Sequence, residues 1–304
     1  MYHGIINIYK EKGYTSHDVV AVLRGVLGQK KIGHTGTLDP EATGVLPVCL
    51  GKGTKVAGLL TDKDKAYIVT FKLGQETDTQ DHTGSVVNEL AWDVTEKQVL
   101  KAIEGFVGPI DQIPPMYSAI KVKGKKLYDL AREGITIERK SRSIVIHEIR
   151  DIKIDLPLIT MTVQCSKGTY IRTLCRDIAE SLGTCGHMTA LERIQSGDFT
   201  LESALTIEEV KAHVTQGSLH QHLVAVSHMF DQYEGLVIKE NFYKLLDNGN
   251  KLPEESFVEK VVVLDGKRFN VYNGERDYIG IYEWNATKAL LVPIKLFFIR
   301  RERG

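Results

Sequence analysis

Residues 33–48 read GHTGTLDPEATGVLPV, and they hold one aspartate, Asp39, among three glycines. Glycine permits backbone angles that other residues avoid, so such a loop can approach a ligand closely. A lone carboxylate in this loop indicates a nucleophile or a base. A second interpretation is that Asp39 begins a helix as its N-cap, because Pro40 suits the first helical position. The segment by itself leaves both open.

The flanking sequence predicts a mixture of helices and strands. Alternation of apolar and polar residues predicts a strand at 66–73, and further apolar runs predict strands at 143–149 and 159–165. Helical spacing predicts helices at 16–27, with Ser16 as the cap and Gly28 as the end, and at 54–60, 95–106, 171–182 and 204–230. Because strict βαβ repetition is absent, we expect an α+β fold with a mixed, largely antiparallel sheet.

From about Leu236 the sequence changes character. Short β-type runs recur between turn signals such as Asp265-Gly266 and Asn273-Gly274. The expected strands cover 236–238, 258–264, 268–272, 278–283 and 289–298. We therefore divide the chain into a catalytic domain, residues 1–234, and a compact β-rich domain, residues 235–304, of roughly seventy residues.

Composition limits the class of protein. The chain has 304 residues, of which 42% are hydrophobic and 26% charged, as in soluble globular proteins. No membrane-length apolar run or signal pattern occurs, so we expect a cytoplasmic protein without a membrane partner. Four cysteines lie at 49, 165, 175 and 185 without Cys-x-x-Cys or zinc spacing. We expect reduced thiols, with no disulfide and no metal.

The net charge is zero, but basic residues gather between Lys121 and Arg142, a segment that we call the basic insertion. It holds eight Lys or Arg residues and three acids. Such an excess can contact a nucleic-acid backbone, although a solvated charged surface is the alternative. The candidate backbone contacts are Lys121, Lys123, Lys125, Lys126, Arg139 and Lys140.

The longer string GHTGTLDPEATGVLPVCLG, at 33–51, resembles the signature of the bacterial tRNA pseudouridine synthase B family. Other segments resemble motifs of that family in the same order, at 13–18, 65–67, 73–79, 113–119, 124–128, 165–174 and 191–193. The resemblance extends from Gly4 to about Ser196 without a departure at the motif positions. The tail resembles the PUA domain, a small RNA-binding β module, in its position in the chain and its composition, but it carries no signature motif of that domain.

The resemblance implies a tRNA pseudouridine synthase that acts on the uridine at tRNA position 55, in the T-loop. The bond from ribose C1′ to N1 breaks, the uracil turns, and C1′ rejoins at C5. This isomerisation requires neither a redox cofactor nor a metal. A carboxylate can attack C1′, attack C6, or support a glycal-like intermediate, and the sequence does not choose among these. The implied partner is the tRNA T-arm, and we expect a monomer.

The resemblance also assigns roles to individual residues. Asp39 is implied as the essential carboxylate, and Arg172 as its partner, which should lower the Asp39 pKa. Tyr67 is implied to stack on a flipped base, although the strand pattern alone favours a core position. Tyr170, which we place before the helix, is implied to contact the uracil, Leu191 to lie against the base, and His34 to contact the RNA.

Two other functions compete with this interpretation. A tRNA-binding or folding module with secondary catalysis would use the same basic insertion and tail. The combination of Asp39, Tyr67 and Arg172 favours an enzyme, because a pure binding protein does not need it. A metal hydrolase would use Asp78, Asp81 and His82, which we interpret instead as a polar turn that ends at Gly84.

Overall fold

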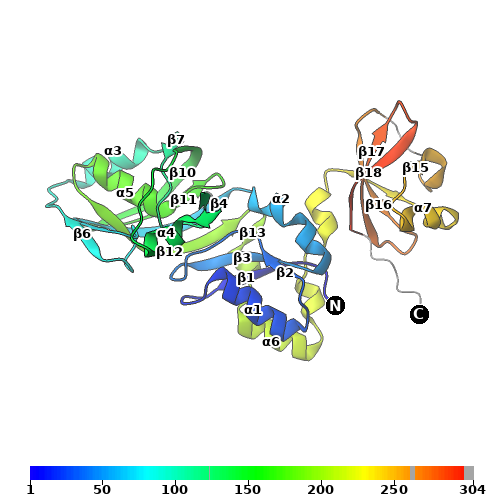
Figure 1. Ribbon diagram of the computed structural model, residues 1–304, viewed down its shortest axis with the longest axis horizontal. Coiled ribbons are helices and arrows are strands. Elements are labelled where there is room, and N and C mark those ends of the chain that lie inside the picture. Colours follow the sequence, from blue (N-terminus) through cyan, green and yellow to red (C-terminus); the bar gives the residue numbers. More distant parts are fainter. Residues whose placement is uncertain (123, 261–263, 298–304) are drawn as a thin grey trace.

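The computed structural model describes residues 1–122, 124–260 and 264–297. One long sheet runs through the N-terminal part of the chain, and a smaller sheet lies beyond one end of it (Figure 1). A segment with two 3₁₀ helices, Leu219–His222 and Val226–Phe230, leads from one to the other. This α+β arrangement with a separate β-rich C-terminal part confirms the predicted fold class.

The central sheet of the described residues has nine strands. The pairing of β3 with β12 is parallel and the other pairs are antiparallel, so the sheet is mixed and largely antiparallel. Its main path runs through β1 (Gly4–Lys10), β3 (Thr43–Leu50), β12 (Gly186–Ser196), β4 (Lys65–Leu73), β11 (Leu158–Cys165), β10 (Arg142–Asp155) and β7 (Gly108–Gln112). Two short strands, β2 (Ile32–His34) and β13 (Phe199–Thr200), pair with β3 and β12.

Helices cover the sheet and create two apolar cores. The helix α1 (Ser16–Leu27) packs Val19 and Leu23 against β1 and β3. Its cap is Thr15, one residue before the predicted Ser16, because Thr15 and Asp18 form a reciprocal capping box. The helices α3 (Glu96–Glu104) and α5 (Ile171–Ser181) pack on β4, β10 and β11 in the second core. These predicted helices are confirmed.

Two predicted helices differ from the structure. The segment 54–60 begins as a 3₁₀ helix over Gly51–Val56 and continues as α2 (Ala57–Thr61). The segment 204–230 is one helix, α6 (Ile207–Gln216), followed by the two 3₁₀ helices. Gly217 adopts a left-handed conformation with φ 71° and ends α6, which is the usual role of glycine at this position.

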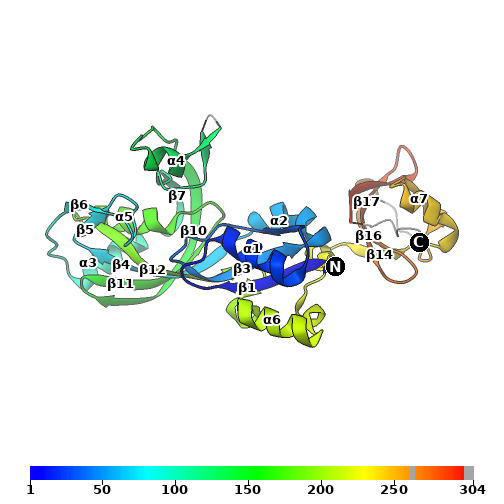
Figure 2. The same cartoon turned by 60° about the horizontal axis from the view of Figure 1, so that its bottom comes forward.

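The basic insertion stands off the central sheet, as Figure 2 shows at α4. It leaves the sheet after β7 and returns as β10. Its elements are β8 (Lys121–Val122), β9 (Lys125–Lys126) and α4 (Leu127–Arg132). A second hairpin, β5 (Gln75–Thr77) with β6 (Val86–Glu89), follows β4.

The tail forms a five-stranded sheet within the described residues. Its order is β14 (Glu234–Val237), β16 (Arg268–Tyr272), β17 (Tyr278–Asn285), β18 (Leu290–Leu296) and β15 (Leu252–Pro253). A short helix, α7 (Tyr243–Asp247), also packs into the core of this β-rich part. The strand predicted at 258–264 does not form over 258–260, and residues 261–263 lie outside the described residues, as does residue 298 of the last predicted strand.

An aromatic cluster anchors the tail to the N-terminal part. The rings of Phe230, Tyr278 and Phe297 lie 5.3–6.4 Å apart, and Ile281 joins them in a core that includes Val45 of β3. The Lys55 Nζ also donates to the Leu296 carbonyl at 2.7 Å. The tail thus shares a core with β3, the strand that follows the Asp39 loop.

Two further observations concern the whole described chain. The four cysteines are buried and carry free thiols. None of the helices described here is long and apolar enough to cross a membrane.

Candidate active site

The loop between β2 and β3 carries Asp39 on a tight turn. The Ala42 amide donates to the Asp39 carbonyl at 3.1 Å, so the chain turns over Pro40 and Glu41 and enters β3 at Thr43. The helix-cap interpretation of Asp39 is therefore wrong. A hydrogen bond to α1 holds the loop, because the Leu38 amide donates to Ser16 Oγ at 2.9 Å. The backbone that carries the carboxylate is therefore fixed.

Arg172, in the first turn of α5, pairs with Asp39. Its Nε lies 3.0 Å from Asp39 Oδ2, and its Nη2 donates to Oδ1 at 3.3 Å. The same guanidinium donates to the carbonyls of Thr79 at 2.9 Å and Tyr117 at 2.8 Å. Only 7% of its side chain is exposed. Arg172 thereby joins the Asp39 loop to the segments that contain Thr79 and Tyr117.

The balance of charges around Asp39 differs from the expected one. Burial raises the Asp39 pKa above its ordinary value, while the Arg172 guanidinium lowers it, Asp81 raises it and Lys10 lowers it. The predicted net lowering by Arg172 is wrong, because the loss of hydration in the pocket outweighs the attraction of the cation. The Asp39 side chain keeps 34% of its surface exposed, so its carboxylate remains reachable for a substrate.

A second carboxylate, Asp81, lies 3.8 Å from Arg172 Nη1 but is occupied differently. Asp81 Oδ1 accepts hydrogen bonds from Thr79 Oγ1 at 2.8 Å and from the Thr83 amide at 2.9 Å. The neighbouring His82 Nε2 lies 3.4 Å from Glu41 Oε2. The described residues contain no group of three potential metal ligands. The Asp81 carboxylate therefore bonds within the polar turn. The Asp39 carboxylate contacts Arg172 and is otherwise partly exposed.

Tyr67, on β4, is 9% exposed and belongs to the core that α5 covers. Burial raises its pKa to about 12, against the opposing positive charge of Arg193, which lies directly opposite Tyr67 on β12. Asp39 is close enough to contribute to this pKa. The core position that the strand pattern favours is thus confirmed, and stacking on a flipped base stays a prediction.

Tyr170 and Leu191 come from two further elements, the residue before α5 and the strand β12. Tyr170 is the residue before α5, with an extended backbone, as predicted. Its amide donates to Gln112 Oε1 at 2.8 Å, and burial raises the pKa of its hydroxyl. Leu191, on β12, is half-buried against the core that α5 covers and pairs with Val69 of β4.

His34 ends β2 at the other side of the Asp39 loop. Its ring meets that of His17 edge-on, with centroids 5.0 Å apart, and its Nδ1 accepts from the Gly36 amide at 3.4 Å. Burial, followed by the charges of His17 and Arg193, lowers its pKa. These contacts place His34 beside the loop but do not join it to Asp39 or Arg172.

The predicted RNA contacts of the basic insertion separate into two kinds. Lys121, Lys125 and Lys140 are exposed, and the half-buried Lys126 lies against Tyr128. Arg139 instead is half-buried, donates to the Pro114 carbonyl at 3.1 Å, and has a pKa that burial lowers. Arg139 therefore braces the base of the insertion. Lys123 lies outside the described residues.

Sequence reasoning missed two buried cations beneath the loop. The sequence patterns assign no role to Lys10 or to Arg193. Lys10 is fully buried, and its Nζ donates to the carbonyls of Glu11, Tyr14 and Pro40 at 2.6–3.0 Å. Burial lowers the Lys10 pKa to about 8. One signal in the sequence could have indicated their burial, namely a basic residue in a strand with buried neighbours. Lys10 is the last residue of β1, and Arg193 lies within β12.

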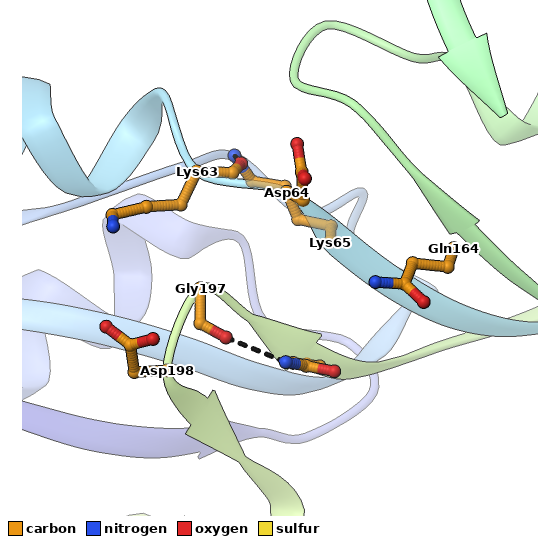
Figure 3. A pocket seen from close by; sticks show the side chains of 7 residues that line it. Lys63, Asp64, Lys65, Gln164, Gly197 and Asp198 are labelled. Carbon is orange, nitrogen blue, oxygen red and sulfur yellow. Dashed lines mark hydrogen bonds between the residues drawn. The ribbon is translucent and has the colours of Figure 1, made fainter. Parts of the chain in front are cut away.

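A polar pocket of about 220 Å³ lies elsewhere on the sheet, where β4, β11 and β12 have their ends (Figure 3). At its edge, the Gln195 Nε2 donates to the Gly197 carbonyl at 2.9 Å. None of the predicted site residues belongs to its lining, which consists of Lys63, Asp64, Lys65, Gln164, Gln195, Gly197 and Asp198.

Comparisons with known proteins bear on this arrangement. Residues 24–171 match the model of the TruB family pseudouridylate synthase N-terminal domain, and residues 172–231 match that of the tRNA pseudouridylate synthase B C-terminal domain. The chain is 47% identical to tRNA pseudouridine synthase B of Clostridium perfringens (strain SM101 / Type A), over 92% of this chain and 94% of that protein. It is 50% identical to the protein of the same name from Lachnoclostridium phytofermentans, over 97% and 99%.

Solved structures share the fold at lower identity. The chain matches a chain in a Cbf5-Nop10-Gar1 complex with TM-score 0.69 and 24% identity, covering 98% of this chain and 86% of that one. It matches a chain of an H/ACA RNP bound to a substrate RNA with TM-score 0.68 and 22% identity, with the same coverages. At these identities the likeness concerns the fold alone.

Proposed function

We propose, because the chain belongs to the TruB family of pseudouridylate synthases, that it converts the uridine at tRNA position 55, in the T-loop, to pseudouridine with Asp39 as the essential carboxylate. Membership of this family makes it a tRNA pseudouridine synthase, which is an isomerase. The observation that carries the finer proposal is the pairing of Asp39 with the buried Arg172, which leaves one side of the carboxylate open.

The reaction conserves every atom of the nucleotide apart from exchangeable protons. The C1′–N1 bond breaks, N1 gains a proton, C1′ bonds to C5, and the C5 proton is released to solvent. Asp39 can serve as a nucleophile at C1′ or C6, or support a glycal-like intermediate, and in each case it acts as the ionised carboxylate. Arg172 holds this carboxylate at fixed geometry through two contacts. Its further bonds to Thr79 and Tyr117 keep the guanidinium itself in place.

The aromatic and apolar side chains near Asp39 suit the binding of a flipped-out base. A uridine in a T-loop must be turned outward to reach Asp39, and an aromatic face retains such a base. We propose that the Tyr67 ring supplies this face and that Tyr170 and Leu191 close the pocket. An apolar enclosure keeps water from the detached uracil, which would otherwise be lost. His34, beside the loop, would contact the RNA next to the flipped nucleotide.

Two surfaces outside the pocket would bind the rest of the T-arm. The exposed lysines of the basic insertion provide positive charge for phosphates. The tail would add affinity as a PUA-like module. The proposed boundary between a catalytic domain, 1–234, and this module, 235–304, falls at the start of β14. A monomer would present all of these surfaces to one tRNA.

The test uses an unmodified tRNA transcript and the full-length protein. Chemical mapping should place pseudouridine at position 55, and tritium release from C5-labelled uridine gives the rate. Asp39→Asn should abolish turnover while tRNA binding changes little, because phosphate contacts remain. Asp81→Asn is the matched control, since it removes the other carboxylate near Arg172. Turnover retained in Asp39→Asn, or pseudouridine at another position only, would refute the proposal. Binding without turnover in the wild type would indicate a binding module instead.

A further inference from the structure

Arg193 of β12 is a buried cation without an acidic partner among the described residues. It is 1% exposed and the largest fully buried side chain of the described chain. None of the ion pairs in the described structure includes it, although burial opposes its charge and lowers its pKa. A charge is costly to bury without a counter-ion, so the hydrogen bonds of the guanidinium have to offset that cost.

Those bonds reach the Asp39 loop from both of its ends. Arg193 Nε donates to the Val45 carbonyl at 2.6 Å, at the start of β3. Its Nη2 lies 3.5 Å from the Gly36 carbonyl, three residues before Asp39. A single side chain therefore spans the loop between Gly36 and Val45.

The backbone of Arg193 makes the same connection. In the sheet, Arg193 pairs with Gly44 of β3 in parallel register and with Tyr67 of β4 in antiparallel register. Gly44 has φ 105°, and a Cβ there would lie 2.2 Å from the Arg193 carbonyl oxygen. Only glycine permits this approach, which brings the loop close to β12.

The side chain of Arg193 also lies beside Tyr67. The two residues are directly opposite each other on antiparallel strands, so their side chains are on the same face of the sheet. The positive charge of Arg193 acts against the burial that raises the phenol pKa. A guanidinium that is itself fixed restricts the orientation of a ring beside it. The cation thus connects the ring proposed to stack on the base with the loop that carries the carboxylate.

We propose that Arg193 is a positioning residue that fixes the Tyr67 ring relative to the Asp39 loop. This inference rests on the proposed function, in which the uridine lies between these two groups. Arg193 lies beneath the loop and does not touch the substrate. Its loss should therefore slow the reaction of bound tRNA rather than weaken binding, because binding comes from phosphate contacts elsewhere.

The variants are Arg193→Met, which removes all donors, and Arg193→Lys, which keeps a charge and some donors. In Arg193→Met, the single-turnover rate at saturating tRNA should fall about 100-fold, the size of effect expected from misplacing reacting groups by about 1 Å. The tRNA Kd should change less than about threefold, and Arg193→Lys should recover part of the rate. A folded Arg193→Met or Arg193→Lys with the wild-type rate would overturn the proposal.

Lys65→Met is the matched control, because Lys65 is a second buried cation that donates to carbonyls. Its bonds go to the carbonyls of Thr61 and Lys63, which lie outside the Asp39 loop and the proposed uridine site. It should lower the melting temperature while leaving the single-turnover rate within about twofold, as expected for a residue without a role in the site. Rates that fall equally in Lys65→Met and Arg193→Met would reduce the Arg193 effect to general loss of packing.

A double-mutant cycle tests the route through Tyr67. Tyr67→Phe removes the phenol oxygen, so adding Arg193→Met or Arg193→Lys to it should cost much less than the same change in the wild type. Additive costs would contradict the proposal. The cycle uses Arg193→Lys if Arg193→Met fails to fold.

A spectroscopic readout does not depend on turnover. With 3-fluorotyrosine incorporated, the ¹⁹F resonance that Tyr67→Phe removes should shift or broaden in Arg193→Met or Arg193→Lys and stay in place in Lys65→Met. An unchanged resonance in the arginine variants would overturn the inference even in an inactive protein. A wild type without activity at position 55 would instead refute the proposed function.

Discussion

The loop site and the basic insertion both depend on cations, but they use them in opposite ways. Lys10, Arg172 and Arg193 are buried and donate to main-chain carbonyls. Lys121 and Lys140 of the insertion are exposed to solvent. Buried donors fix geometry, since a carbonyl left without its donor is costly, whereas exposed cations attract phosphates in a salt-dependent way. The position of a cation, more than its charge, therefore determines whether it affects rate or affinity.

The largest expected effect tests the buried group at Arg172. Arg172→Met leaves Asp39 without its partner and removes donors from the Thr79 and Tyr117 carbonyls. We expect the single-turnover rate to fall about 1,000-fold, the loss typical of one preorganised electrostatic contact. Arg172→Lys should recover only part of it, because lysine cannot make a bidentate contact. Tritium release at saturating tRNA measures the rates of both variants. A tRNA Kd that rises as much as the rate falls would contradict the view that buried cations affect rate rather than affinity.

Lys10→Met should lower both the rate and the stability, with a smaller effect on the rate than Arg172→Met or Arg193→Met. The Lys10 change removes a donor from the carbonyls of Glu11, Tyr14 and Pro40, of which Pro40 keeps a bond from the Gly13 amide. A buried carbonyl left without a donor costs about 1–3 kcal/mol. The loss of a desolvated charge offsets part of that cost. Because Pro40 follows Asp39 directly, we expect the rate at saturation to fall about tenfold, within the range for displaced catalytic groups. Urea unfolding together with single-turnover rates separates the two effects, and a wild-type rate would contradict the expectation.

The pH dependence of the rate should show the raised pKa of Asp39. The reaction needs the ionised carboxylate, so the rate falls as the pH drops through this pKa. Because burial raises the pKa, the fall should begin at a higher pH than for an ordinary aspartate. Arg172 lowers the pKa, so Arg172→Met should move the fall to still higher pH. Single-turnover rates at constant ionic strength measure both, and a shift toward lower pH in Arg172→Met would contradict this balance.

The sequence predicts local features well and distant contacts poorly. Alternation locates β4, and the glycine-rich motif identifies the Asp39 loop, because both patterns are local. The burial of Arg193 could not be predicted, since its carbonyl partner Val45 lies 148 residues away. The sign of the Asp39 pKa shift depends on a competition between burial and Arg172 that only the packed site defines. The helix-cap interpretation failed because β3 begins before a helix can form.

The smallest expected effect lies within the insertion, where Arg139 and Lys140 are adjacent but belong to opposite classes. Arg139 donates to the Pro114 carbonyl, whereas Lys140 is exposed. Lys140→Met should weaken tRNA binding a few-fold, and the slope of log affinity against log salt should become shallower by about one, as for a single phosphate contact. Arg139→Met should leave that slope nearly unchanged, because its guanidinium bonds to the protein.

The Arg139 change should instead loosen the base of the insertion. Faster hydrogen exchange at residues near 113–119 would show this, and Lys140→Met serves as the control in that measurement. Measurement of tRNA affinity at several salt concentrations decides between the two residues. Equal slopes in both variants would mean that burial does not determine the roles of Arg139 and Lys140. The distinction between buried cations that fix geometry and exposed cations that attract phosphates would then not hold within the insertion. A slope that changes only in Lys140→Met would extend the contrast to two residues that are neighbours in the chain.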